Sequence, residues 1–196
     1  MMLDENTRVL IINSQNVYKN NATGVTERSI VASIPSNNLM ELYRFDSRDS
    51  VNVKFGFESV QIPPKSMPFN YLSRKILKLD NYYDKLNVGG VDYSKGATYS
   101  WKSVISVIIK SYLENSYVFP DKNFLKKVDD FSPTIIYTMG ASIYVHKWVL
   151  YFANRYKCPV VMHYMDNWRE TAYKQDYRLN PVFRLQQKQL NAIENK

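Results

Sequence analysis

The second half of the chain alternates between amphipathic helical segments and short apolar runs, and this alternation constrains the fold more than any other feature. The helical segments are 100–116, 120–131, 142–157 and 180–195, and the apolar runs between them are 133–140 and 159–165. Strands that alternate with helices of about 10–15 residues form parallel βαβ units with right-handed crossovers. We therefore predict an α/β fold, a Rossmann-like parallel sheet with helices on both faces.

The first half fits the same architecture less completely. The run "RVLIIN" (8–13) is typical of a buried parallel strand, which is apolar on both faces. A polar loop follows, then a helix over 25–34 that Pro35 ends, and a second strand over 38–45. Residues 46–98 mix Pro- and Gly-rich breaks with an alternating run, 51–57, that is a strand candidate. The rest of that region gives no firm assignment.

Residue types at the helix starts predict where several helices begin. Ser100, Ser142 and Asn180 are of the type that caps helices, because their side-chain oxygens accept hydrogen bonds from the first backbone N–H groups. Pro120 stands near the start of one helix, and Pro181 at the first helical position of another.

Composition indicates one folded domain. The chain has 196 residues, of which 45% are hydrophobic and 22% charged, and this balance suffices for a sizeable core. The single cysteine, Cys158, cannot form an internal disulfide and is expected to be a buried thiol. The start of the chain does not have the pattern of a secretion signal, and no apolar run approaches the roughly 18 residues of a membrane span. We therefore expect a cytoplasmic protein.

The formal net charge of +8 is spread along the chain. A basic surface can meet nucleic acid, anionic lipid or phosphorylated ligands, or it can simply be solvated. Nucleic acid is disfavoured, because the sequence has neither a basic recognition helix nor an aromatic sheet platform.

Parallel sheets bind ligands beyond the carboxyl ends of their strands, so the segments 14–24, 139–142 and 166–175 are candidate site segments. In the first, Gly24 precedes a predicted helix, and a helix N-terminus favours anions. Thr23, Gly24, Val25 and Thr26 are thus candidates for a phosphate contact; an ordinary capped loop is the alternative. The three glycines of the dinucleotide-binding motif are missing.

The turn "MGAS" places Gly140 between a strand and a helix, where glycine serves either ligand contact or close packing. His146 lies on an apolar helix face and is expected to be structural. His163 falls in the last predicted strand, as a core residue or a catalytic one. Two histidines without cysteine partners give no metal-ligand spacing, so no metal or other cofactor is predicted.

The motif "MDNW" follows the strand 159–165. A carboxylate at Asp166 is suited to accept a hydroxyl proton or to orient a sugar hydroxyl; its alternative is a turn cap. Trp168 is suited to stack on a sugar or a lipid; its alternative is a lid over the sheet edge.

Three segments taken in order resemble the N-terminal domain of GT-B glycosyltransferases, especially the family 4 type found in surface-polysaccharide pathways. They are "RVLIINSQNVYKNNATGVTERSIV", "FSPTIIYTMGASI" and "PVVMHYMDNWRETAY". The resemblance covers most of the chain and is weakest over 46–98. It implies that residues 1–196 form the acceptor-side half of a two-domain enzyme whose C-terminal, nucleotide-sugar-binding domain is absent from this chain.

The resemblance also implies roles for individual residues. The glycine loop at Gly24 would touch the donor diphosphate, and Asp166 would be the catalytic residue on the acceptor side. Met165 stands where many relatives carry histidine, so that histidine's role is not transferred. The remaining acceptor contacts would be His163, Asn167, Trp168 and Gly140.

The expected activity is transfer of a sugar from a nucleotide sugar to a saccharide or lipid-linked acceptor, without a metal. The alternative is a non-catalytic α/β ligand-binding module. We expect the isolated residues 1–196 to fold but to transfer little sugar. Apolar surface near Met139 and Met165 would allow weak self-association, and the basic excess would hold the enzyme at an anionic membrane surface.

Overall fold

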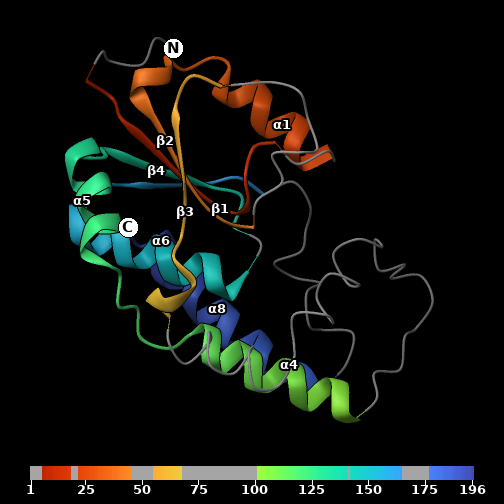
Figure 1. The fold of residues 1–196 in the computed structure, drawn as a ribbon. Coiled ribbons are helices and arrows are strands. Elements are labelled where there is room, and N and C mark those ends of the chain that lie inside the picture. The colour runs from red at the N-terminus through yellow and green to blue at the C-terminus, as the bar shows by residue number, and fades with distance from the viewer. Residues whose placement is uncertain (1–5, 19–21, 46–54, 68–100, 141, 165–176) are drawn as a thin grey trace.

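The structure is a computed structural model that describes residues 6–18, 22–45, 55–67, 101–140, 142–164 and 177–196. Its centre is a parallel sheet with the strand order β3-β2-β1-β4-β5 (Figure 1). The strands are β1 (Val9–Gln15), β2 (Leu39–Phe45), β3 (Glu58–Gln61), β4 (Ile135–Thr138) and β5 (Val160–Met162). The helices are α1 (Ala22–Val31), α4 (Trp101–Glu114), α5 (Lys122–Phe131), α6 (Ile143–Tyr156) and α8 (Asn180–Glu194), with 3-10 turns η1 (Ser36–Asn38), η3 (Pro64–Ser66) and η4 (Tyr177–Leu179).

The sheet confirms the predicted α/β, Rossmann-like fold. β1 pairs in parallel with β2 on one side and with β4 on the other, so the first strand of the chain lies at the centre. β5 extends the sheet beyond β4, and β3 forms the opposite edge. The runs 8–13, 134–139 and 159–165 therefore belong to one parallel sheet, as the sequence predicts.

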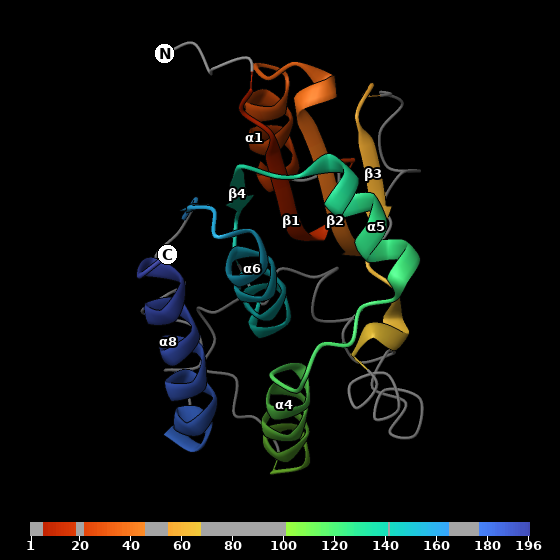
Figure 2. The ribbon, with the colours of Figure 1, turned by 90° about the vertical axis from the view of Figure 1, so that its left-hand side faces the viewer.

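Alternate residues of β1 supply the two faces of the sheet. Val9 and Ile11 pack with Val31 of α1 on one face. Leu10 and Ile12 pack on the other face with residues of α5 and α6. Figure 2 shows the sheet between α1 and α5. Burial of both faces explains why this strand is a continuous apolar run.

The helix α6 is the centre of the larger core. Trp148 and Phe152 are fully buried on it, and their rings stack with centroids 5.7 Å apart. Ser142 caps the helix as predicted, because its Oγ accepts a hydrogen bond from the Val145 N–H at 3.2 Å. The buried Cys158 lies in the same core as an unpaired thiol.

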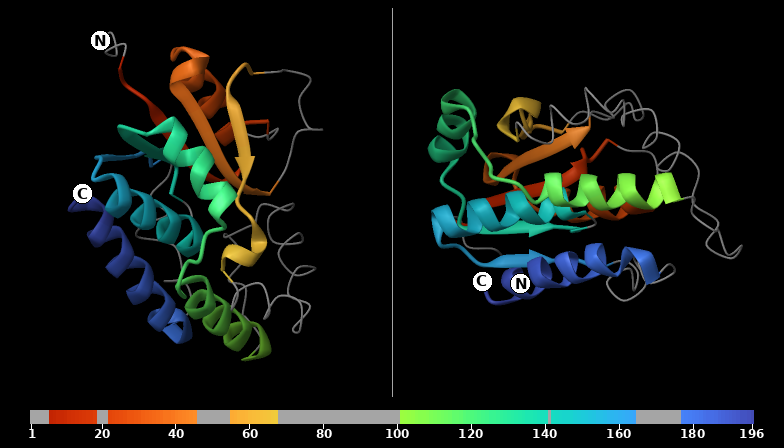
Figure 3. Two further views of the ribbon diagram at one scale, coloured as in Figure 1. Left: turned by 60° about the vertical axis from the view of Figure 1, so that its left-hand side comes forward. Right: turned by 90° about the horizontal axis from the view of Figure 1, so that it is seen from below.

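The helices α8 and α4 form an outer layer beyond α6 (Figure 3). A buried ionic cluster joins α4 to the sheet: Arg44 at the end of β2 lies 2.9 Å from the Glu114 carboxylate, and Lys110 lies 3.3 Å from it. Burial alone would raise the pKa of Glu114, but the two cations outweigh it and lower that pKa. The carboxylate is thus held ionised between two elements that are distant in sequence.

Several element boundaries differ from the sequence prediction. The first helix begins at Ala22 rather than at 25 and ends at Val31. The last strand is shorter than 159–165, and Asn180 lies inside α8, whose cap is Leu179 at the end of a 3-10 turn. Asp121 caps α5, accepting the Asn123 and Phe124 N–H groups, so Pro120 stands near the start of the helix as predicted, just outside it.

The region 46–98 was predicted with least success. Residues 55–57 precede a strand rather than forming one, and the strand that follows, β3, was not predicted. Its sequence "ESVQ" is short and polar because it lies at an edge of the sheet, where only part of each residue is buried. Residues 51–54 and Ser100 lie outside the described residues.

Candidate functional site

The sheet places a candidate site between the carboxyl ends of β1 and β4. From β1 the chain continues toward β2 and β3 on one side, and from β4 it continues to β5 on the other. The order of the strands therefore reverses between β1 and β4. In open α/β sheets, ligands usually bind at such a switch point, outside the carboxyl ends of the strands. We call this region between the ends of β1 and β4 the crevice.

Two serine hydroxyls face each other across this switch point. Ser14 lies near the end of β1, and Ser142 precedes α6; their Oγ atoms are 3.3 Å apart. Both side chains are partly exposed. A hydroxyl both donates and accepts hydrogen bonds, so this pair can bind a ligand hydroxyl or a phosphate oxygen.

Hydrogen bonds beneath the serines fix the two strand ends to each other. The Asn13 side-chain oxygen accepts the Met139 N–H at 2.9 Å, and its amide nitrogen donates to the buried Glu27 of α1. The Thr138 hydroxyl donates to the Ile12 carbonyl at 2.7 Å. The crevice is therefore preorganised by side chains that are themselves buried.

The turn after β4 requires glycine. Gly140 has a φ of +55°, and a Cβ at this position would lie 3.0 Å from the sulfur of Met162. Its N–H donates to the Thr138 hydroxyl at 2.9 Å, and its carbonyl contacts the His146 ring. These contacts are internal and support the packing interpretation; the predicted acceptor contact of Gly140 stays a prediction.

His146 is structural, as its apolar helix face predicted. It is fully buried, with Nε2 against the Gly140 carbonyl and Nδ1 3.3 Å from Gln189 Oε1. The Gln189 amide in turn donates to Asn115 at 2.8 Å. Burial lowers the pKa of His146 to about 4, although the contacts with Gly140 and Gln189 oppose it. The ring therefore lies between the turn after β4 and α8, and when it is neutral it donates its single N–H to one of these two oxygens.

His163 lies just beyond β5 and reaches back to β4. Its N–H donates to the Thr138 carbonyl at 2.9 Å, and its Nδ1 lies 3.0 Å from the Tyr137 hydroxyl. Burial and, secondarily, the charge of Glu27 raise the pKa of Tyr137 to about 12, so the phenol keeps its proton. When that phenol donates to Nδ1, the neutral ring carries its hydrogen on Nε2. His163 is then a hydrogen-bond donor at the carboxyl edge.

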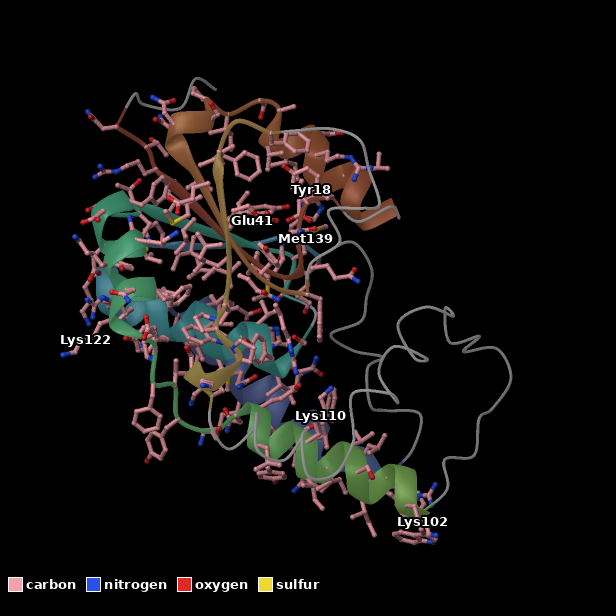
Figure 4. The ribbon with its side chains drawn as sticks, in the orientation of Figure 1. Tyr18, Glu41, Lys102, Lys110, Lys122 and Met139 are labelled. Carbon is pink, nitrogen blue, oxygen red and sulfur yellow. The ribbon has the colours of Figure 1, made fainter. Side chains whose placement is uncertain are left out.

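A buried carboxylate holds the loop that follows β1. Glu41 of β2 accepts the Val17 N–H at 2.6 Å and the Ser59 hydroxyl at 2.5 Å. Arg28 of α1 donates to the Val17 carbonyl at 3.0 Å. Figure 4 shows Glu41 close to Met139 and Tyr18, and away from Lys102 and Lys110 on α4. The backbone N–H and carbonyl of Val17 are thus both held by hydrogen bonds from side chains.

The predicted phosphate-binding residues lie within α1 rather than in a loop before it. Because α1 begins at Ala22, Thr23, Gly24, Val25 and Thr26 belong to its first turns. Gly24 is buried, and Val25 is 55% exposed. The contact of these residues with a phosphate stays a prediction, now assigned to a helix N-terminus.

Part of the predicted site lies outside the described residues: Asp166, Asn167, Trp168 and Met165.

The residues that sequence reasoning missed are Asn13, Ser14, Glu27, Glu41 and Tyr137. Glu41 left a signal, because a carboxylate within the otherwise apolar run "LMELY" must be paired when it is buried.

A second concave surface lies between α4, η4 and α8, with a volume of about 760 Å³. Its floor is aliphatic and includes Val104, Ile108 and Leu185. Trp101, Tyr112 and Tyr177 also line it, and they are 64%, 53% and 77% exposed. We call this surface the α4–α8 groove. Its exposed aromatic side chains distinguish it from the polar crevice.

Within the described ranges, no group of three or more histidine, cysteine, aspartate or glutamate residues is arranged to hold a metal ion. None of the helices in the described part of the chain combines the length and apolar character needed to cross a bilayer. No protein-family model, curated protein or solved structure matches the chain.

Proposed function

We propose that this chain is the acceptor-side domain of a GT-B-type glycosyltransferase, which transfers a sugar from a nucleotide sugar to a saccharide or lipid-linked acceptor. The observation that carries the proposal is the position of polar groups at the carboxyl edge of the sheet: Ser14 and Ser142 at its switch point, and His163 just beyond the neighbouring strand β5. The fold and the resemblance of the three sequence segments support it.

The chemistry of the crevice suits a neutral, hydroxyl-rich ligand. The Ser14 and Ser142 hydroxyls can each donate and accept, and the His163 ring can donate from Nε2 when Tyr137 donates to its Nδ1. Saccharide hydroxyls also both donate and accept hydrogen bonds, so they can pair with such groups. We assign this edge to the acceptor, with Asp166 as the base that accepts the acceptor's hydroxyl proton.

The donor side of the proposal rests on the first turns of α1. Thr23, Gly24, Val25 and Thr26 would contact the donor phosphates, because the partial positive charge of a helix N-terminus favours phosphate oxygens. The enzyme would work in the cytoplasm, at the inner face of the membrane where its acceptor is lipid-linked.

The test is a transfer assay on the protein encoded by the complete reading frame, with a panel of nucleotide sugars. We expect transfer from at least one donor. The double substitution S14A/H163Q should lower kcat/KM by about 10-fold or more, because each side chain supplies a hydrogen bond to the acceptor.

The matched control is Ser29→Ala, which removes an exposed hydroxyl on α1 that bonds only within its helix. Its activity should equal that of the unchanged enzyme. A folded protein that transfers from no nucleotide sugar contradicts the proposal. If that protein still binds saccharides at this edge, it is a non-catalytic binding module instead.

A further inference from the structure

The α4–α8 groove combines apolar and cationic walls in a way that the crevice does not. The α4 wall presents Trp101, Ile105 and Tyr112, all of which are more than half exposed. The opposite wall carries the cations of the groove, Arg178 on η4 and Arg184 and Lys188 on α8. None of the described residues that line the groove is acidic. An occupant should therefore be apolar along one side and anionic along the other.

The two cations of α8 are available to such an occupant. Arg178 is engaged with Trp101, because its guanidinium lies 4.9 Å from the centre of the indole ring. Arg184 and Lys188 are exposed and one helical turn apart, and neither forms an ion pair with any residue that the structure describes. Their charges are thus not neutralised within the described protein.

The size and aromatic content of the groove favour a lipid. A volume of about 760 Å³ is within the usual range for a small-molecule site. It is small for a docked helix as long as the groove. Tryptophan and tyrosine are the side chains that concentrate at membrane interfaces, where one end of the ring is apolar and the other hydrated. A second copy of the chain would bring two basic walls together, which their repulsion opposes.

We propose that the α4–α8 groove binds an anionic lipid at a bilayer surface, with the lipid chain on the aliphatic floor and its phosphate beside Arg184 and Lys188. This inference rests on the proposed function only in taking a membrane as the partner. It specifies the surface that would present the carboxyl-edge site to a lipid-linked acceptor.

The test is flotation of the protein with phosphatidylcholine vesicles that contain or lack phosphatidylglycerol, at low and high salt. We expect binding only to the anionic vesicles, weaker at high salt because the charges are then screened. R184E/K188E should reduce this binding by at least about 25-fold, since each basic residue near an anionic surface contributes about fivefold.

The matched control is K122E/K126E, which changes the charge equally at two exposed positions one turn apart on α5. This control should keep most of the binding. In a Trp168→Phe background, the emission of Trp101 should shift to shorter wavelength on anionic vesicles, and Trp101→Phe should abolish that shift, because the remaining Trp148 is buried beforehand. Thermal unfolding confirms that each variant is folded.

Equal loss in the two charge variants would show a diffuse electrostatic attraction and overturn the proposal. Equal binding to neutral and anionic vesicles, or binding to neither, would also overturn it; an acidic protein segment would then be the candidate occupant. Because vesicle flotation measures no sugar transfer, its failure leaves the proposed function standing, and an inactive enzyme leaves this inference standing.

Discussion

The carboxyl-edge crevice and the α4–α8 groove differ in how the protein treats its polar groups. In the crevice, Asn13, Thr138 and Glu41 are buried and hydrogen-bonded to neighbouring strands and loops. In the groove, Arg184 and Lys188 are exposed, and so are the rings of Trp101, Tyr112 and Tyr177. The geometry of the crevice therefore depends on the fold, whereas substitutions of the side chains that line the groove should have little effect on stability.

The largest expected effect comes from disrupting the buried ionic cluster that joins α4 to the sheet. Glu114 neutralises Arg44 at the sheet and Lys110 on α4, and all three side chains are largely buried. Glu114→Gln removes the carboxylate that the buried Arg44 and Lys110 share, and should lower the free energy of unfolding by about 3–5 kcal/mol. Denaturant unfolding measures this change.

The control for that substitution is Glu58→Gln, at an ion pair whose carboxylate is about half exposed. It should change the free energy of unfolding by less than about 1 kcal/mol. Similar costs at Glu58 and Glu114 would contradict the structural role of the buried cluster.

Acid should lower the stability of the folded protein through His146, whose ring contacts the turn after β4. Its pKa is about 4 in the folded protein and 6.5 ordinarily, so between these values the unfolded chain binds a proton that the folded protein does not. Stability is therefore lost as the pH falls through this window, by up to about 3 kcal/mol. Unfolding should be followed above pH 5, where Glu114 contributes little to the pH dependence.

The variant His146→Gln should have a flatter pH dependence over that range, even if it is less stable at neutral pH. Parallel stability curves for this variant and the unchanged protein would rule out a buried neutral ring at position 146.

The next effect tests the turn after β4. Gly140→Ala should lower the free energy of unfolding by about 2 kcal/mol, because of the left-handed backbone and the close contact with Met162. Gly56→Ala is the control, since its Cβ would meet only the Ser36 side chain at 3.3 Å or more and its φ is not in that region. Chemical denaturation of the two variants should separate them; equal costs would contradict the assigned geometry.

The smallest effect belongs to the groove. Trp101→Ser should change the free energy of unfolding by less than about 1 kcal/mol, because most of the side chain is already in water. A larger loss in a thermal melt would mean that Trp101 belongs to the core, and the distinction between the two regions would fail.

The fold was readable from the sequence where burial on both faces makes a strand largely apolar, as in β1 and β4. The edge strand β5 was also predicted, because its residues are apolar although Val161 is 50% exposed. The fold was not readable at β3, an edge strand whose sequence is mostly polar. The cap at Ser142 was predicted from residue type, but its contact with Ser14 was not, because 128 positions separate the two hydroxyls. That pairing depends on the strand order.

The groove shows a different limit of sequence reasoning. Apolar residues at helical spacing in 100–116 predicted an amphipathic helix, and α4 is one. The same spacing does not tell which positions face the core: Val104 is buried, whereas Ile105 and Tyr112 are exposed. Only the packing of α8 and η4 beside α4 determines that a concave surface remains.

The most direct test of a ligand site at the carboxyl edge is a set of amide nitrogen–proton correlation spectra of the chain, titrated with a panel of nucleotide sugars and saccharides. We expect shifts that saturate at the end of β1, the first turns of α1, the turn around Gly140 and His163, with the groove unchanged. Shifts confined to the groove, or no saturable shifts with any of these ligands, would contradict a ligand site at the carboxyl edge.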